Sequence, residues 1–303
     1  MDPNITQLAQ MLSRAIVGKD QAIQLILAAF FSGGHALLED VPGVGKTLLA
    51  KALARAVKGR FQRVQFTPDL LPTDLTGTNV WNPQTGSFEF IPGPVFTQVL
   101  LADEINRATP RTQAGLLEVM EEQQVTTDGV SRPVGEPFFV IATQNPVEYQ
   151  GTSPLPEALL DRFAVSLSLG YPSENEELQM LQRLDRQQNP LDAITPCLDL
   201  SQVLTIRQAC AQVKMTEPLQ RYVLALIRTT RTDQQITLGA SPRAAVTLQR
   251  VTQAWAYLQG RNYALPDDVK AIAPFVLAHR LIITGGRPGQ EVIDRLLKTV
   301  AIP

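Results

Sequence analysis

Short apolar runs alternate with amphipathic segments over the first half of the chain, a pattern that predicts a parallel sheet with flanking helices. Apolar residues at helical spacing in 20–31 and 47–57 predict two of these helices. The runs expected to form buried strands are residues 36–38, 61–66, 99–102, 138–142 and 163–169. The predicted fold class of this half is therefore α/β with a parallel sheet.

The pattern changes at Tyr171-Pro172, beyond which no strand of this kind recurs. Ser173–Glu176 reads as a capping box and predicts a helix to about residue 187. Further helices are predicted to begin at Ser201, Glu217, Ser241 and Asp267. We therefore predict two domains, residues 1–171 and an all-helical domain over residues 172–303, in a chain long enough for each to have its own core.

Two segments of the first domain have the pattern of β-hairpins rather than of sheet strands. The first, about residues 78–92, is rich in turn residues and carries Trp81, Phe88 and Phe90 with no evident core to fill. An insertion of this length is unusual for an idle linker. The second, about residues 125–136, contains Asp128-Gly129, the dipeptide that most strongly favours a tight hairpin turn.

The segment between the first predicted strand and the next helix has the composition of a phosphate-binding loop. It fits the pattern G-x-x-x-x-G-K-[ST], except that Asp40 replaces the first glycine. Because aspartate tolerates a positive φ, we expect the loop to form despite this exchange. Lys46 is expected to reach the outer phosphates and Thr47 to ligate Mg²⁺. The predicted nucleotide-binding residues of the loop are Asp40, Val41, Pro42, Gly43, Val44, Gly45, Lys46, Thr47 and Leu48.

Polar side chains also follow two later strands. Asp103 and Glu104 end the apolar run 99–102, which is the pattern of a Walker B motif. We expect Asp103 to hold the Mg²⁺ shell and Glu104 to activate the attacking water. Asn145 follows the run 138–142, and the carboxyl ends of parallel strands meet at one edge of the sheet. Asn145 is therefore expected near Glu104, although an asparagine in a turn is the simpler alternative.

Arg243 lies in the first turn of a predicted helix, one position after Pro242. A cation at a helix N-terminus is destabilising by roughly 0.3–1 kcal/mol, because it lies at the positive end of the helix dipole. It would be favoured there if a bound anion contacted both the arginine and the helix N-terminus. A solvated arginine that tolerates this cost is the alternative, and the sequence pattern alone does not decide between the two.

Composition narrows the function classes. The formal net charge of −2 gives no sign of the basic surface that nucleic-acid binding requires. Cys197 and Cys210 have neither disulfide nor metal spacing, which fits a reducing compartment. The N-terminus is unlike a signal peptide, and the apolar run 25–31 is too short to span a bilayer. We expect a soluble cytoplasmic protein without membrane insertion.

In order and spacing, these motifs closely resemble those of the MoxR family of AAA+ ATPases. The resemblance covers essentially the whole chain and is carried by residues 65–72, 101–108, 142–146, 155–163, 239–243 and 277–280. It implies a P-loop NTPase αβα sandwich followed by an all-helical lid, with ATP and Mg²⁺ as cofactors. It also implies a homo-oligomeric ring, expected to be a hexamer, that remodels or assembles a protein client with a von Willebrand factor A domain protein as partner.

The resemblance implies roles for single residues as well. Val17 and Gly18 match the turn that borders the adenine, and Asn145 matches the first sensor, which orients the lytic water. Arg162 matches the arginine finger, which reaches the ATP of a neighbouring subunit. Arg243 matches the second sensor, which contacts phosphate from the lid. The two predicted hairpins match hairpins that face the pore in related rings.

Two other function classes stay open. One is a ring motor that acts on nucleic acid, but 81–90 contains no cation and 125–134 contains only Arg132. The other is a nucleotide-bound structural switch without turnover, against which the presence of Glu104 and Arg162 argues. The interpretation we favour is an ATPase that converts ATP and water to ADP and phosphate.

Overall fold

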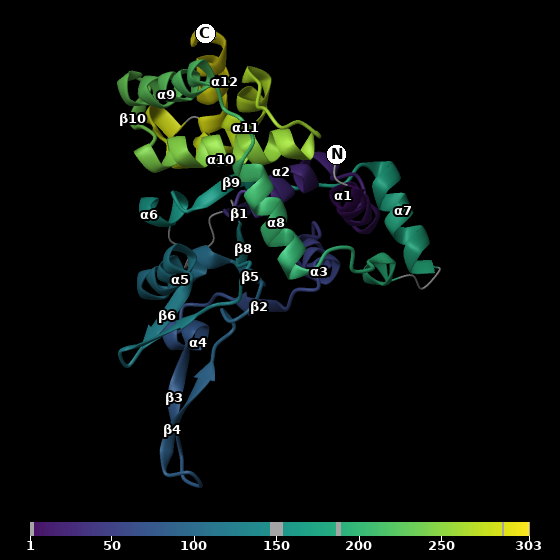
Figure 1. The fold of residues 1–303 in the computed structure, drawn as a ribbon, viewed down its shortest axis with the longest axis vertical. Helices are drawn as coiled ribbons and strands as arrows, with labels where there is room; N and C mark the ends of the chain where they lie inside the picture. Colours follow the sequence, from purple (N-terminus) through teal and green to yellow (C-terminus); the bar gives the residue numbers. More distant parts are fainter. Residues whose placement is uncertain (1–2, 146–153, 186–188, 287, 303) are drawn as a thin grey trace.

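The computed structural model describes residues 3–145, 154–185, 189–286 and 288–302 (Figure 1). At its centre lies a five-stranded sheet in the order β2-β5-β8-β1-β9, in which every neighbouring pair is parallel. The predicted α/β class with a parallel sheet is therefore confirmed. The strands are β1 (His35–Glu39), β2 (Phe61–Gln65), β5 (Val99–Asp103), β8 (Phe139–Gln144) and β9 (Phe163–Leu167).

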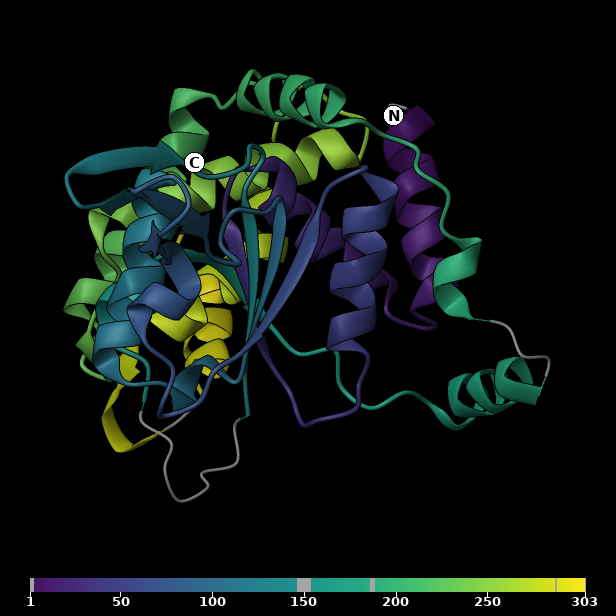
Figure 2. The same ribbon diagram turned by 90° about the horizontal axis from the view of Figure 1, so that it is seen from below.

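Helices cover both faces of this sheet and make a three-layer sandwich (Figure 2). Successive strand residues point to opposite faces. Leu38 and Ile141 therefore pack with the first three helices, whereas Leu37 and Val140 pack with α5 on the other side. The helices of this part are α1 (Pro3–Ala15), α2 (Asp20–Phe31), α3 (Lys46–Ala56), α4 (Pro72–Thr76), α5 (Pro110–Glu122) and α6 (Glu157–Leu160), with a 3₁₀ turn at Ile105–Arg107.

After β9 the chain is mainly helical, as predicted. The prediction of an all-helical lid missed one short antiparallel pair, β10 (Ile236–Leu238) with β11 (Ile282–Ile283), because these strands are too short to show alternation. No helix in the described ranges is long and apolar enough to cross a membrane. The helices are α7 (Glu174–Asp185), α8 (Leu200–Ala211), α9 (Glu217–Thr232), α10 (Pro242–Leu258), α11 (Pro266–Leu277) and α12 (Gly289–Thr299), with 3₁₀ turns at Pro190–Ala193, Ala278–Arg280 and Thr284–Gly286.

The lid does not have a core of its own, contrary to our expectation. The apolar cluster on the α1–α3 side of the sheet continues without a break into helices α8 to α12. A buried ion pair adds to this joint, since Arg280 Nε lies 3.0 Å from Asp161 Oδ1 and Arg280 Nη2 donates to Phe163 O at 2.7 Å. The change of pattern after residue 171 therefore separates two kinds of secondary structure that share one core.

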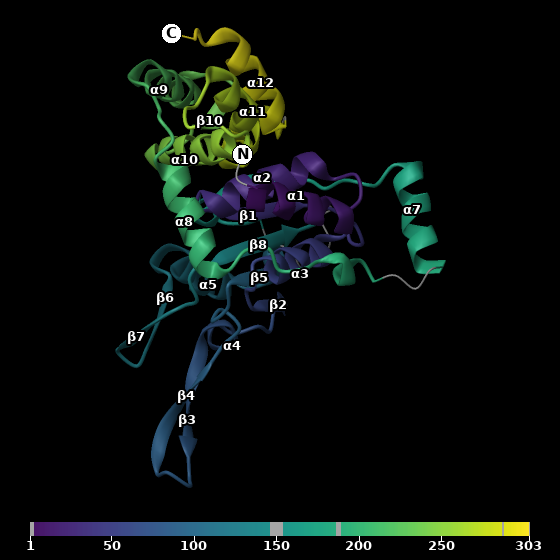
Figure 3. The same ribbon diagram turned by 45° about the vertical axis from the view of Figure 1, so that its right-hand side comes forward.

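The two predicted hairpins are present and extend from the sandwich on the same side (Figure 3). They are in contact with each other. The Arg132 guanidinium lies over the Phe90 ring, 4.0 Å from its centre, and Asn79 Nδ2 donates to Asp128 Oδ2. The first hairpin consists of β3 (Gly77–Asn82) and β4 (Ser87–Pro92), and the second of β6 (Gln124–Thr127) and β7 (Val130–Pro133).

His35 is buried and His279 half-buried, and the surroundings of each lower its pKa. His35 accepts a hydrogen bond at Nδ1 from Val140 N (3.1 Å), so its Nε2–H faces Met120 O (3.4 Å). Burial lowers the pKa of His35 to about 4, against the opposing effect of the Met120 hydrogen bond. Burial and the adjacent Arg280 guanidinium lower the pKa of His279 well below its ordinary value.

We expect the free energy of unfolding to fall as the pH is lowered from 7 to 5. The unfolded chain takes up protons on both histidines near their ordinary pKa of 6.5, before the folded chain can do so. Each histidine then lowers the free energy of unfolding by up to about 1.4 kcal/mol for each unit by which the pH falls. Urea unfolding of the wild type and of His35→Gln over this pH range measures the slope. The variant should have the smaller slope, and equal slopes would contradict the buried neutral histidine.

Candidate functional site

The loop between β1 and α3 has the geometry of a phosphate cradle. Gly43 (φ +91°) and Gly45 (φ +100°) adopt left-handed conformations, and no atom lies within 4 Å of the Cβ position of either glycine. The open concave backbone leads directly into the N-terminus of α3, which favours an anion. Lys46 Nζ donates to Asp40 O (2.8 Å) and Val41 O (2.9 Å), so its ammonium lies beneath the loop. These groups fit a nucleotide phosphate.

Asp40 is present for a different reason from the one we expected. It is not among the residues with a positive φ, so tolerance of that conformation does not explain it. Its buried carboxylate instead accepts hydrogen bonds from Ser168 Oγ (2.6 Å), Leu169 N (2.7 Å) and Gly170 N (2.9 Å). Asp40 therefore ties the start of the phosphate loop to the chain that leaves β9.

The two acids after β5 are held in a fixed arrangement by Thr143. Thr143 Oγ1 donates to Asp103 Oδ1 (2.6 Å) and accepts from Glu104 N (2.9 Å). Glu104 has a left-handed backbone (φ +57°), which for a residue with a side chain costs about 1–3 kcal/mol and is typical of functional sites. Sequence reasoning assigned Thr143 no role, although a polar residue at the end of a buried neighbouring strand is a usable signal.

The outer oxygens of both acids are occupied by side chains that the sequence analysis did not assign. Arg63 Nη2 lies 2.6 Å from Asp103 Oδ2, and Gln65 Nε2 donates to Glu104 Oε2 at 2.9 Å. Arg107 Nη1 also contacts Glu104 Oε2, at 2.6 Å. The parallel register of β2 and β5 brings these groups together. A ligand at this edge must compete with Arg63, Gln65 and Arg107 for the two carboxylates.

Thr47 and Asp103 both lie at the carboxyl edge of the sheet, at the start of α3 and the end of β5. Among the described residues no group of three or more His, Cys, Asp and Glu could hold a metal ion. Mg²⁺ in nucleotide sites needs few protein ligands, since phosphate oxygens and waters complete its shell. One hydroxyl and one carboxylate at this edge therefore fit such an ion.

Asn145 follows β8, which lies between β1 and β5 in the sheet. The backbone continues this pairing beyond the strand ends, because Asp40 N donates to Gln144 O at 3.2 Å. Asn145 therefore belongs to the same edge as the phosphate loop and Glu104.

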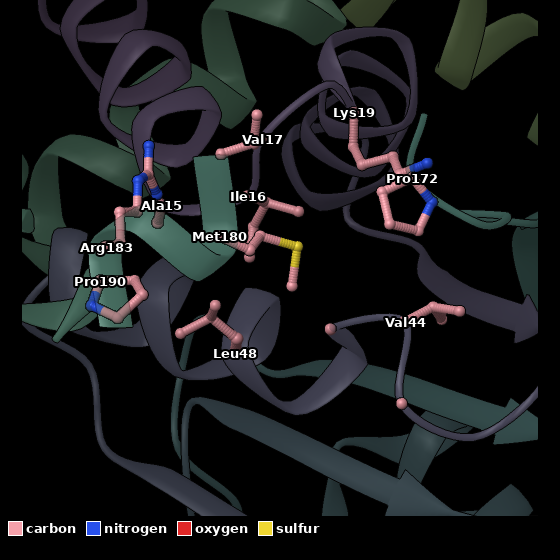
Figure 4. A pocket seen from close by; sticks show the side chains of 12 residues that line it. Ala15, Ile16, Val17, Lys19, Val44, Leu48, Pro172, Met180, Arg183 and Pro190 are labelled. Atoms are coloured by element: carbon pink, nitrogen blue, oxygen red, sulfur yellow. The ribbon is translucent and has the colours of Figure 1, made fainter. Parts of the chain in front are cut away.

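An apolar cavity of about 210 Å³ lies beside the phosphate loop (Figure 4). Val17 from the turn before α2 and Val44 and Leu48 from the loop and α3 line it, and Gly18 (φ +74°) forms the same turn. Met180 closes it from α7, a contact that sequence reasoning missed because it joins distant segments. The cavity fits a flat apolar base.

Arg162 and Arg243 lie at the opposite, amino edge of the sheet. They line a second cleft, of about 380 Å³, together with residues 32–35 at the start of β1. Phe163 pairs with His35 in the register, so Arg162 directly precedes that end of the sheet. The whole of β1 separates this cleft from the phosphate loop, roughly 17 Å for five residues. An arginine side chain is too short to cover this distance, so neither arginine reaches the loop of its own chain.

Comparison with known proteins agrees with this geometry. Residues 35–165 match the family model of ATPases associated with various cellular activities (AAA), and residues 228–298 match the AAA lid domain. The chain is 40% identical to Chaperone MoxR1 of Mycobacterium tuberculosis, over 96% of this chain and 80% of that protein. It is 34% identical to Protein MoxR of Methylorubrum extorquens, over 90% and 85%. The crystal structure of a proposed ATPase from Cytophaga hutchinsonii has a TM-score of 0.91 at 38% identity, over 99% and 95%.

Proposed function

The chain belongs to the MoxR family of AAA+ ATPases, and from this premise we propose that it hydrolyses ATP in active sites shared between neighbouring copies of itself. The observation that carries the proposal is the division of the predicted site between two edges of one sheet. The phosphate loop and the acids Asp103 and Glu104 lie at the carboxyl edge, whereas Arg162 and Arg243 line a cleft at the amino edge.

At the carboxyl edge, Lys46 and the loop backbone bind the phosphates, and the apolar cavity around Val17 and Met180 binds the base. Thr47 and Asp103 would hold Mg²⁺, which would neutralise part of the phosphate charge when bound. Glu104 takes the proton of the attacking water, and Asn145 orients that water. The left-handed backbone of Glu104 supports this assignment, because such strain persists where a side chain must have a defined direction.

At the amino edge, Arg162 and Arg243 stabilise the charge that develops on the phosphates of the adjacent subunit. Sharing of this kind needs a head-to-tail contact between copies, which a closed ring provides, and we propose the hexamer that the family resemblance implies. The client is a protein, with a von Willebrand factor A domain protein as partner, and the ring works in the cytoplasm.

The first hairpin supports a role in contacts with a protein client or partner. Trp81 is 52% exposed and Phe88 68% exposed, and their rings pack edge to face at 5.3 Å, away from either core cluster. A pair of exposed aromatic side chains on an extended hairpin is typical of an interaction site. A nucleic-acid motor has less support, because Arg132, the cation of the second hairpin, is engaged by Phe90.

The first test separates binding from turnover. Lys46→Ala should weaken ATP binding at least about tenfold, because it removes a charge-assisted contact to ground-state phosphate. Glu104→Gln should leave binding nearly unchanged and slow turnover about 10²- to 10⁴-fold, because the general base is lost. Equilibrium binding of a fluorescent ATP analogue and a phosphate-release assay measure the two effects. Equal loss of affinity in both variants would break the assignment.

The second test concerns the hairpin. Trp81→Ser together with Phe88→Ser should leave basal ATPase activity and thermal stability unchanged, because neither side chain belongs to the core. The variant should lose most of its ability to suppress aggregation of a heat-denatured reporter enzyme. Leu224→Ser, at a 51% exposed position on α9, is the matched control for removal of exposed apolar surface. Unfolding of the double variant would show that these rings have a structural role.

The third test mixes two inactive proteins. Arg162→Ala should bind ATP nearly normally but turn over about 10³- to 10⁵-fold more slowly, the loss typical of a missing arginine finger. In rings mixed with Lys46→Ala, some interfaces combine an intact loop with an intact arginine, so phosphate release should partly return. The absence of recovery in preparations shown to exchange subunits would count against sharing of the site.

A further inference from the structure

One carboxylate, in the last turn of α5, joins two of the three arginines that line the amino-edge cleft, Arg162 and Arg243 but not Arg250. Glu121 Oε2 accepts from Arg162 Nε (3.1 Å) and Nη2, and Glu121 Oε1 accepts from both Nη groups of Arg243 (3.1 Å each). We propose that Glu121 is a positioning residue that holds Arg162 and Arg243 as one unit for the phosphates of the neighbouring subunit. This inference rests on the proposed function.

The pattern of contacts leaves Arg162 able to act while it is held. Glu121 occupies the side edge of this guanidinium, formed by Nε and Nη2. The end edge, formed by the two Nη groups, keeps an unused N–H on each nitrogen in this contact and is the edge that forks onto phosphate oxygens. Glu121 can therefore fix the direction of Arg162 without blocking its reach toward an anion.

Electrostatic repulsion explains why Arg162 and Arg243 need a carboxylate between them. Two guanidinium ions in one cleft repel each other and would separate into solvent. The Arg162 side chain is 19% exposed and that of Glu121 36% exposed, so solvent screens this cluster only in part. With one carboxylate oxygen toward each arginine, the two guanidinium groups stay together. The three side chains then carry a net charge of +1 toward the incoming phosphate.

The backbone under all three side chains is fixed by buried contacts. Met120, next to Glu121, faces His35 through its carbonyl oxygen. Asp161, next to Arg162, binds the buried Arg280 and also accepts from Ser241 Oγ at 2.9 Å. Ser241 is the N-cap of α10, two residues before Arg243, so the same carboxylate also helps to set the position of the second arginine.

A role of Glu121 as a simple tie between lid and sandwich is less consistent with these contacts. The Asp161–Arg280 pair and the continuous apolar cluster already make that joint, and both are far more buried than Glu121. Loss of the Glu121 charge should therefore affect turnover rather than folding.

The test compares Glu121→Gln with Glu122→Gln, which removes an acid from the adjacent position of α5, outside the residues that line the cleft. In full-length rings, Glu121→Gln should lower kcat about 10- to 100-fold, since small misplacements of reacting groups have effects of this size. The KM for ATP, the thermal midpoint and the ring size should stay at wild-type values. Glu122→Gln should match the wild type throughout.

Two further measurements show whether Glu121 acts through the arginine cleft or through the phosphate loop. In an Arg162→Ala, Arg243→Ala background, Glu121→Gln should cause no additional loss of kcat, because the groups that it positions are gone. In mixed rings, Glu121→Gln should regain activity with Lys46→Ala, whose arginine cleft is intact, but not with Arg162→Ala.

Three results would overturn the role of Glu121 while leaving the shared ATPase site intact. They are a wild-type kcat in Glu121→Gln, a full further loss of kcat when Glu121→Gln is added to the Arg162→Ala, Arg243→Ala background, and recovery of activity in rings mixed from Glu121→Gln and Arg162→Ala. A wild type without ATP turnover, or an Arg162→Ala variant as active as the wild type, would overturn the proposed function and this inference together.

Discussion

The parallel direction of the strands, and of β1 in particular, determines where the two halves of the predicted site lie. All five strands of the sheet are parallel, so the loops that follow them gather at the carboxyl edge and the residues that precede them at the amino edge. The phosphate loop follows β1, and Arg162 precedes β9, the neighbour of β1. The length of β1 alone keeps these groups apart. Under the proposed function, a single chain with this topology therefore contains two half-sites, each of which needs a second copy to be complete.

The lid is packed firmly against the sandwich, and this packing fixes the place of Arg243. Its apolar residues belong to the same cluster as α1, α2 and α3, and breaking the buried Asp161–Arg280 pair by removing one partner would cost about 3–5 kcal/mol. Arg243 is therefore carried at a fixed place beside Arg162. If the site is shared as proposed, a change at the phosphates of an adjacent subunit would act on lid and sandwich together, and the main movement during turnover would then occur between subunits.

The strands and the phosphate loop could be predicted because their signals are local. Apolar runs such as 99–102 end in a polar pair, and the glycines of the loop lie within a few residues of Lys46. Thr143, Gln65 and Glu121 could not be assigned, because their roles depend on strand register and on helix ends that meet only in the folded chain. The helix α1 was missed although Ile5, Leu8 and Leu12 form its buried stripe, and the reason for Asp40 lies in a contact 129 residues away. The roles predicted for single site residues, from Lys46 and Glu104 to Asn145, Arg162 and Arg243, all stay predictions.

The same topology gives α5 a part in connecting successive active sites. Glu104, at the carboxyl edge, contacts Arg107 in the 3₁₀ turn that leads into α5 through the Thr109 cap. The helix then runs back along the sheet for 13 residues, roughly 20 Å, and carries Glu121 in its last turn, at the arginine cleft. A helix transmits a shift at one end to the other because its hydrogen-bonded backbone resists compression. If ATP displaces Gln65 and Arg107 from Glu104, the resulting shift at the start of α5 would reach Glu121, the carboxylate that we propose to orient the arginines for a neighbouring subunit. We infer that nucleotide state passes around the ring along α5, from the acid of one site to the arginines of another.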